Sequence, residues 1–257
     1  MKHSKISLSL AAAAMLATPA LAQDWYAGGS ISYLNQSDSD NSGTTGAFTT
    51  GNLGNDTTLD VASGTPYGWN TEFDNGTGFS AEVGARYANG LRSGIELSLT
   101  SADVDTHSGV TLGGGSIDAL DAASIAGSPT PLGATVADVV ADGRGEISST
   151  SVFANVYYDF YRTGTVQPYV GAGIGFSDVD VTYNPSAVGV VDGGETKFAY
   201  QVKAGATWLV TDTWEVYGEY AYRATEDIEL DNDLFPGTLD IENQQNLFSV
   251  GVRYRFG

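Results

Sequence analysis

Large apolar residues recur at every second position in eight separate runs of the chain. This is the period of a β-strand, in which alternate side chains point to opposite faces. Gly, Ser and charged residues fill most of the intervening positions, so each predicted strand has one large apolar face and one small or charged face. The eight predicted strands are residues 25–33, 79–87, 95–99, 152–160, 170–176, 198–208, 214–222 and 248–256.

The connections between these strands alternate strictly between short and long. Short ones lie near residues 89–90, 162–164 and 211–213, and long ones span 35–76, 101–146, 177–195 and 225–242. This pattern predicts an up-and-down antiparallel sheet with four long loops at one end. The pair Asn89-Gly90 is typical of a two-residue hairpin. The apolar residues on both flanking strands are odd-numbered, however, so we expect a three- or five-residue turn or a bulge there.

The banding of the large residues decides which face they occupy. An eight-stranded barrel is only wide enough inside for side chains to fill it, and aromatic residues from every strand would overfill that space. Aromatic residues cluster at both ends of the predicted strands, with aliphatic residues mostly between them. Two aromatic girdles around an aliphatic belt are typical of a lipid-facing surface. We therefore predict a transmembrane β-barrel. The alternative is a soluble barrel with its apolar face inward.

The first residues have the features of an export signal. Lys2 and Lys5 precede a weakly apolar stretch over 6–16, and Ala20-Leu21-Ala22 matches a small-x-small cleavage site. We predict a signal peptide over 1–22 and a barrel domain over 23–257. The alternative is an N-terminal helix of the fold.

Composition narrows the class of protein further. The 257 residues include no Cys, which excludes disulfides and thiolate metal sites. A mean hydropathy of −0.10 is too low for a protein with several membrane-spanning helices. The formal charge of −20 argues against nucleic acid as a partner, because phosphate binding needs a basic surface. Gly is abundant, with 33 residues, against a usual share of about 7%.

The negative charge lies almost entirely in the long connections. These four segments hold 24 of the 31 acidic residues and one base, Arg144. The strands and short turns are close to neutral. We expect the charged residues of the strands to pair inside the barrel, because an unpaired buried charge costs several kcal/mol. They form either a structural salt-bridge plug or the lining of a selective pore. The predicted interior charge network is Glu82, Arg86, Glu96, Lys203, Glu215, Glu219, Arg223, Arg253 and Arg255.

The long connections are rich in Gly, Ser, Thr and Asp, which predicts a solvated, mobile surface. Receptor or matrix contact is an alternative role. Divalent-cation binding near residues 103–105 or 231–233 is another, although neither acidic cluster has the spacing of an EF-hand loop. Residues 116–126 are predicted to form a short helix after a Ser cap.

Signs of catalysis are sparse. A nucleophilic site needs a base positioned beside the nucleophile. In the mature chain the one histidine is His107, and a set with Ser108 and Asp105 rests on adjacency in sequence alone. We predict no enzyme activity, no catalytic residues, no cofactor and no metal.

Four stretches carry a resemblance to a known family: FANVYYDF at 153–160, QPYVGAGIG at 167–175, GEYAYR at 218–223 and FSVGVRYRF at 248–256. The chain resembles the small outer-membrane β-barrel proteins, which include the opacity-type surface antigens, the OmpA transmembrane domain and OmpX. The last stretch is similar to their C-terminal assembly signal, with Tyr254 and Phe256 in the aromatic positions. The family usually ends on the aromatic itself, whereas here Gly257 follows.

Together these features predict a non-enzymatic outer-membrane surface or structural protein with acidic extracellular loops and an adhesin-like contact with host or matrix. The alternative is a narrow, porin-like passive channel for small solutes. The resemblance implies export to the bacterial outer membrane. It implies outer-membrane lipid, lipopolysaccharide and the outer-membrane assembly machinery as partners.

Overall fold

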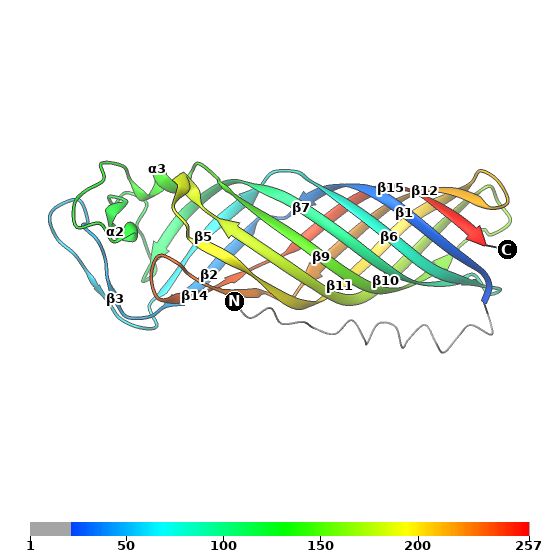
Figure 1. The fold of residues 1–257 in the computed structure, drawn as a ribbon, viewed down its shortest axis with the longest axis horizontal. Helices are drawn as coiled ribbons and strands as arrows, with labels where there is room; N and C mark the ends of the chain where they lie inside the picture. The colour runs from blue at the N-terminus through cyan, green and yellow to red at the C-terminus, as the bar shows by residue number, and fades with distance from the viewer. Residues whose placement is uncertain (1–21, 257) are drawn as a thin grey trace.

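The computed structural model of the protein describes residues 22–256. Eight long antiparallel strands close into a barrel in which each strand pairs with both neighbours (Figure 1). The predicted eight-stranded antiparallel barrel is therefore confirmed. Most of the predicted signal peptide, residues 1–21, lies outside the described residues, as does Gly257. Around the ring the strands are β1 (Ala22–Gln36), β6 (Gly76–Tyr87), β7 (Leu91–Leu112), β9 (Gly145–Asp159), β10 (Val166–Tyr183), β11 (Val191–Leu209), β12 (Trp214–Thr225) and β15 (Gln244–Phe256).

The large apolar face points outward along the part of the barrel nearer the short turns. Ile31, Ile174 and Val250 are 60–64% exposed, whereas hydrophobic side chains are normally buried. Exposed aromatic residues flank this aliphatic belt at both ends, with Trp214 and Phe256 at one and Phe79 and Phe176 at the other. Closure of the ring leaves no free strand edge, as hydrocarbon surroundings require.

The register across the first short turn fits the parity of the sequence. Arg86 pairs with Arg92, and three residues, 88–90, separate β6 from β7. The prediction that this turn is longer than a two-residue hairpin is confirmed.

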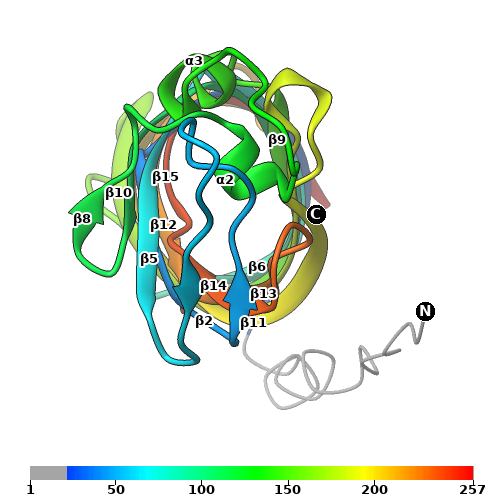
Figure 2. The same cartoon turned by 90° about the vertical axis from the view of Figure 1, so that its left-hand side faces the viewer.

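The long connections contain far more β-structure than the sequence predicted. A second layer of strands extends the wall beyond the barrel, in the order β13-β14-β2-β5-β7, with β8 beside the tip of β7. The end-on view shows this layer around the rim, with shorter segments crossing the opening (Figure 2). The prediction of mobile loops was wrong for these segments. They are β2 (Ser39–Thr45), β3 (Phe48–Thr49), β4 (Asp60–Val61), β5 (Pro66–Phe73), β8 (Gly115–Ser116), β13 (Ile228–Asp231) and β14 (Gly237–Ile241).

The physical reason is that the apolar face changes sides along the strands. On β10, Ile174 points outward and is 60% exposed, whereas Val179 and Val181 point inward and are buried. Asp178 and Asp180 are exposed on the outer face of the same strand. The strand thus continues without a break past the level of the outer aromatic girdle. Its polar face turns from the interior to the outside, as expected where water replaces lipid.

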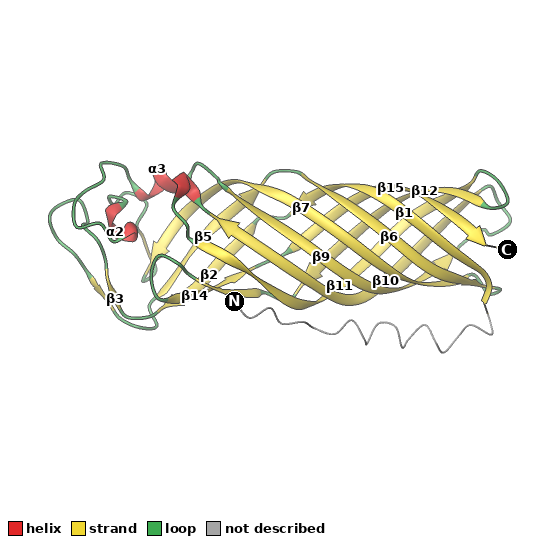
Figure 3. Ribbon diagram, viewed as in Figure 1, coloured by secondary structure: helices red, strands yellow, loops and turns green. Residues whose placement is uncertain are grey.

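Helices are few and short (Figure 3). α2 covers only Ala123–Ala126, so the predicted helix over 116–126 was wrong for most of its length. Asp121, rather than a Ser cap, accepts the Ala123 backbone N–H at 2.9 Å. α3 (Val136–Val140) begins at a capping box between Thr135 and Asp138, and a 3₁₀ turn covers Pro185–Ala187. Among the described residues, no helix combines the length and the apolar character needed to cross a membrane.

Candidate functional site

The middle of the barrel interior holds a cluster of charges around Glu96. Its carboxylate forms ion pairs with Lys203 Nζ and with Arg223 Nη2, the latter at 3.2 Å. Lys203 also reaches Glu219 at 2.9 Å. Glu96 and Arg223 are each 2% exposed. Lys203 bridges two acids and Glu96 bridges two bases, so the charges form one connected network rather than separate pairs.

Glu82 departs from the predicted pairing with a base. No ion pair within 4 Å involves it among the described residues. Its carboxylate instead accepts hydrogen bonds from the hydroxyls of Tyr26, at 2.6 Å, and Tyr157. Asn155 Nδ2 donates both to Glu82 and to Glu96, at 2.9 Å each. Glu82 and Glu96 are directly opposed on β6 and β7, so the Asn155 amide satisfies two carboxylates that would otherwise repel each other.

Nearer the short turns, Glu215 is the centre of a second cluster. It is fully buried and pairs with Arg86 at 2.7 Å, Arg253 at 3.1 Å and Arg255 at 3.3 Å. The structure thus places all nine predicted residues toward the interior. It connects eight of them by ion pairs, while Glu82 is held by hydrogen bonds.

The sequence-based list of interior charges missed a further pair and its aromatic surroundings. Arg92 is fully buried and donates to Asp159 at 3.0 Å. Its guanidinium lies 4.4 Å from the ring centroid of Tyr157 and 4.7 Å from that of Tyr169. Such cation–π contacts are strongest where water is excluded. Strand parity is the signal for these residues, because all of them alternate with the outward-facing set.

Glycines on neighbouring strands make room for these inward rings. A Cβ on Gly171 would lie 2.3 Å from the Tyr157 ring, and one on Gly84 would lie 2.5 Å from Tyr26. No side chain fits at either position without displacing the ring. Part of the high Gly content therefore permits large tyrosines inside a narrow barrel.

Above the charged layers the interior becomes first hydroxyl-rich and then apolar. Ser32 bonds to Ser249 at 2.7 Å, and Ser151 bonds to Ser177 at 2.8 Å. An apolar core follows, which includes Ile147, and it fills the wall region formed by the outer strands. Buried side chains of three kinds, charged, hydroxyl and apolar, thus occupy the barrel in successive layers.

The outer surface carries the negative charge. None of the 24 acidic residues in the long connections is buried. Asp103, Asp105, Asp231 and Asp233 are all exposed, and no group of three or more His, Asp or Glu residues in the described part of the chain is placed to hold a metal ion. The outer end is therefore a broad acidic surface with ordered β-structure beneath it.

His107 is not brought together with its two sequence neighbours. Its ring is buried and Nδ1 lies 2.8 Å from Thr71 Oγ1, whereas Asp105 and Ser108 are exposed. Burial lowers the pKa of His107 to about 4, so the imidazole is neutral at physiological pH. The ring packs against Tyr183 at 4.8 Å between centroids. The structure gives it the surroundings of a core side chain.

The two residues of the predicted assembly signal lie on the last strand. Tyr254 pairs with Ala27 and Phe256 with Trp25 across the seam between β1 and β15. Their rings are 5.0 Å apart, and Tyr254 also contacts Trp214 at 5.0 Å. They belong to the aromatic girdle at the short-turn end.

Comparison with known proteins agrees with this architecture. A family model described as "Outer membrane protein beta-barrel domain" matches residues 8–256. Outer membrane protein PagN of Salmonella typhimurium is 25% identical over 124 residues, which are 44% of this chain and 52% of PagN. The chain thus spans about half the length of this curated relative.

Solved structures of outer-membrane barrels are similar in fold. The outer membrane protein OprG from Pseudomonas aeruginosa superposes with a TM-score of 0.52 at 15% identity, covering 92% of this chain and 97% of OprG. Neisserial surface protein A gives a TM-score of 0.46 at 14% identity, covering 90% and 97%. At this level of identity the likeness to OprG concerns the fold alone.

Proposed function

Because the chain belongs to the outer-membrane protein β-barrel domain family, and is thus an outer-membrane protein of bacteria, we propose that it is a closed, non-enzymatic surface protein. In this role the barrel holds the protein in the outer membrane. The acidic outer layer makes an adhesin-like contact with host or matrix surfaces. Fold alone does not determine function, so the proposal rests on the filling of the interior and the charge of the outside.

The observation that carries the proposal is the layered interior. Charged side chains around Glu96 and Glu215 are paired and buried, and an apolar core lies above them. A conducting pore needs a continuous wet path, and both the paired charges and the apolar core argue against one. Most of the barrel therefore forms a rigid support for the outer strands.

Conductance in planar bilayers tests closure directly. We expect no stable current steps from the intact protein. We also expect none from Glu219→Ala, which removes one carboxylate bound to Lys203 but leaves the apolar core in place. A large, stable current from the intact protein would favour the porin-like alternative and contradict the proposal.

The surface role is tested by neutralising exposed acids without changing their shape. Asp227, Asp231, Asp233 and Asp240 are all exposed on or beside β13 and β14. The fourfold Asp→Asn variant should bind less well to cells or matrix-coated surfaces, and the salt dependence of its binding should weaken. The fourfold Asp→Glu variant keeps the charge and is the matched control. Equal binding by the Asn variant and the native protein would refute a charge-based contact.

The remaining partners follow from the same proposal. A signal peptide over residues 1–22 would direct export, and Tyr254 and Phe256 would present the last strand to the outer-membrane assembly machinery. The aliphatic belt would contact outer-membrane lipid and lipopolysaccharide. Replacing Phe256 by Ser should lower the amount of assembled barrel in cells, whereas Phe248→Ser, on the same face of the same strand, should lower it less.

A further inference from the structure

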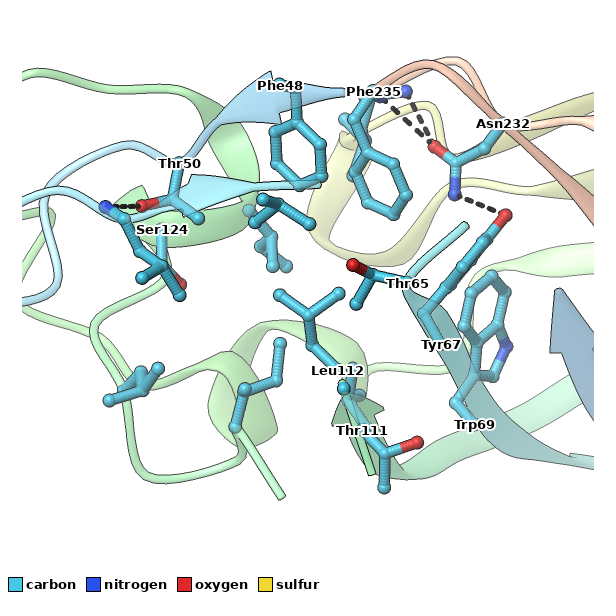
Figure 4. Close-up of a pocket in the computed structure, with 18 of the residues that line it drawn as sticks. Phe48, Thr50, Thr65, Tyr67, Trp69, Thr111, Leu112, Ser124, Asn232 and Phe235 are labelled. Carbon is cyan, nitrogen blue, oxygen red and sulfur yellow. Dashed lines mark hydrogen bonds between the residues drawn. The ribbon is translucent and has the colours of Figure 1, made fainter. Parts of the chain in front are cut away.

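The outer end of the barrel encloses a cavity of about 430 Å³. It lies between the outer strands and a roof that is made of the β3–β4 hairpin and α2 (Figure 4). Segments far apart in the sequence meet around it: residues 48–69, 107–140, 183–190 and 232–235. A volume of this size lies within the range of small-molecule pockets, about 300–1,000 Å³.

Hydrogen bonds within the wall and the roof fix the shape of the cavity. Asn232 Oδ1 accepts the Leu234 backbone N–H at 2.8 Å, and its Nδ2 donates to the Tyr67 hydroxyl at 3.5 Å. On the roof side, the backbone N–H of Gly51 donates to the Ser124 carbonyl at 3.1 Å, which joins the hairpin to α2. A preformed site of this kind loses little conformational freedom when a ligand enters.

The lining is mainly aliphatic and aromatic. Phe48 and Phe235 stack with centroids 4.9 Å apart, and Leu112 and Ile117 face the same space. No Lys or Arg is found among the described residues that line it. Its one carboxylate, Asp60, is exposed and accepts a hydrogen bond from Thr49 at 2.7 Å. An anionic ligand would therefore find no countercharge here and would meet an acidic outer surface on its way in.

Two buried polar atoms of the lining have no partner within the described structure. They are Ser124 Oγ and His107 Nε2, and each side chain belongs to a residue that is 3% exposed. Buried polar groups are normally hydrogen-bonded, and one left unpaired lowers stability. A hydroxyl or carbonyl oxygen on a bound molecule can supply the missing bond. The two atoms are thus a second, independent indication of a ligand.

The cavity ends inside the protein rather than leading through it. The apolar core, with Ile147 and Val181 fully buried, lies between it and the charged layers of the barrel. On the outer side Leu59 is 51% exposed, so apolar surface reaches the opening. A ligand would enter from the external medium and be held, not passed to the periplasm.

We propose that this cavity binds an uncharged, largely apolar small molecule with a single hydrogen-bonding oxygen, of the long-chain alcohol class, taken up from outside the cell. The apolar body fills the space between the outer strands and the roof. The oxygen bonds to Ser124 Oγ. This binding is separate from the surface contact proposed above and does not depend on it.

The proposal is tested with the full-length mature protein in lipid nanodiscs, which avoids competition from detergent. The readout is displacement of N-phenyl-1-naphthylamine, a neutral fluorescent probe, with empty nanodiscs as the baseline. We expect saturable probe binding, displaced more strongly by 1-dodecanol than by dodecanoate at pH 7. Absence of saturable binding above the baseline, or stronger displacement by dodecanoate, would overturn the proposal.

Variants locate the site. Leu112→Trp should reduce probe affinity at least tenfold by filling the cavity. Leu97→Trp adds the same bulk on the lipid-facing wall and should leave affinity unchanged. Ile125→Phe provides a second cavity-filling change, which keeps the test decisive if Leu112→Trp fails to assemble. Native affinity in an assembled cavity-filling variant would overturn the proposal.

The identity of the occupant is tested by two further arms. Ser124→Ala should weaken dodecanol binding about five- to tenfold and leave dodecane binding unchanged, because only the alcohol uses the hydroxyl. Purified lipopolysaccharide supplies acyl chains from the outer leaflet and should not displace the probe. Displacement by lipopolysaccharide but not by dodecanol would show that the cavity binds a lipid chain rather than a free molecule. That result would overturn the proposal.

Discussion

Glu96→Gln is the substitution that most directly tests whether the interior charges act as one buried unit. Glu96 is 2% exposed and accepts from four groups: Lys203, Arg223, and the side-chain amides of Asn155 and Gln201. Gln has nearly the same shape but carries no charge, and its NH₂ group would face other donors. Lys203 keeps its pair with Glu219, whereas Arg223 loses the one ion pair that it makes within the described structure.

The expected cost follows from the burial of Arg223. Removing one partner of a buried ion pair leaves an uncompensated charge and typically costs about 3–5 kcal/mol. This corresponds to a roughly 10²- to 10³-fold or larger shift in the folding equilibrium, since about 1.4 kcal/mol is a factor of ten. Urea unfolding in short-chain lipid vesicles measures the change. The girdle tryptophans, Trp25, Trp208 and Trp214, report the loss of the membrane-facing environment.

The matched control is Glu226→Gln, because Glu226 is exposed on the outer surface. We expect it to change the free energy of unfolding by less than about 0.5 kcal/mol. The double change Glu96→Leu with Arg223→Met should lower the free energy of unfolding less than Glu96→Leu alone. The double change removes both members of the ion pair, so Arg223 is not left as an unpaired buried charge. A loss below about 1 kcal/mol in Glu96→Gln would refute the view that the network stabilises the barrel as a unit.

Three further outcomes are expected from single substitutions, each checked by chemical unfolding in the same lipid vesicles unless stated. Gly171→Ala should cost about 1–3 kcal/mol by pushing the Tyr157 ring, whereas Gly189→Ala, in open space, should have almost no effect. The pKa of His107 is about 4 in the fold, against about 6.5 when unfolded, so the unfolded chain binds more protons between these values. Stability should therefore fall as the pH drops from about 6.5 to 4, by up to about 1.4 kcal/mol per unit, and His107→Gln should lack this part of the pH dependence. Thr135→Ala removes the side-chain half of the α3 capping box and should cost about 1 kcal/mol locally, seen as faster proteolysis of the outer layer with no change in the barrel.

The barrel was predictable because lipid imposes a simple pattern on it. Most outward positions between the girdles are apolar, as at Ile31 and Val250, so a period of two identifies both the strand and its orientation. The parity of the residues around Asn89 even constrained the turn. These features depend on neighbours along the chain and on the solvent outside, both of which the sequence records.

The interior was predictable in its residue types but not in its partners. The charged residues were identified as inward-facing, yet the pairing of Glu82 with a base was wrong. Tyr26 and Tyr157 reach Glu82 from β1 and β9, and which hydroxyl reaches which carboxylate depends on the shear of the closed ring. The cavity is less predictable still, because its lining comes from four separate segments that meet only after closure.

The strands of the outer layer were not predicted from the sequence, because their apolar residues change to the other face of the strand. Its strands have the same period of two as the barrel, but the apolar residues occupy the other parity, as at Val179 and Val181 after Ile174. A search that follows one face of a strand loses the signal where that face becomes polar. The change of parity marks the level at which water replaces lipid, and it falls between Phe176 and Asp178 on β10. The same change gives the outer layer a core of its own beneath its acidic surface. Because that core can be packed independently of the membrane, the outer layer has room both for a rigid surface and for an enclosed cavity.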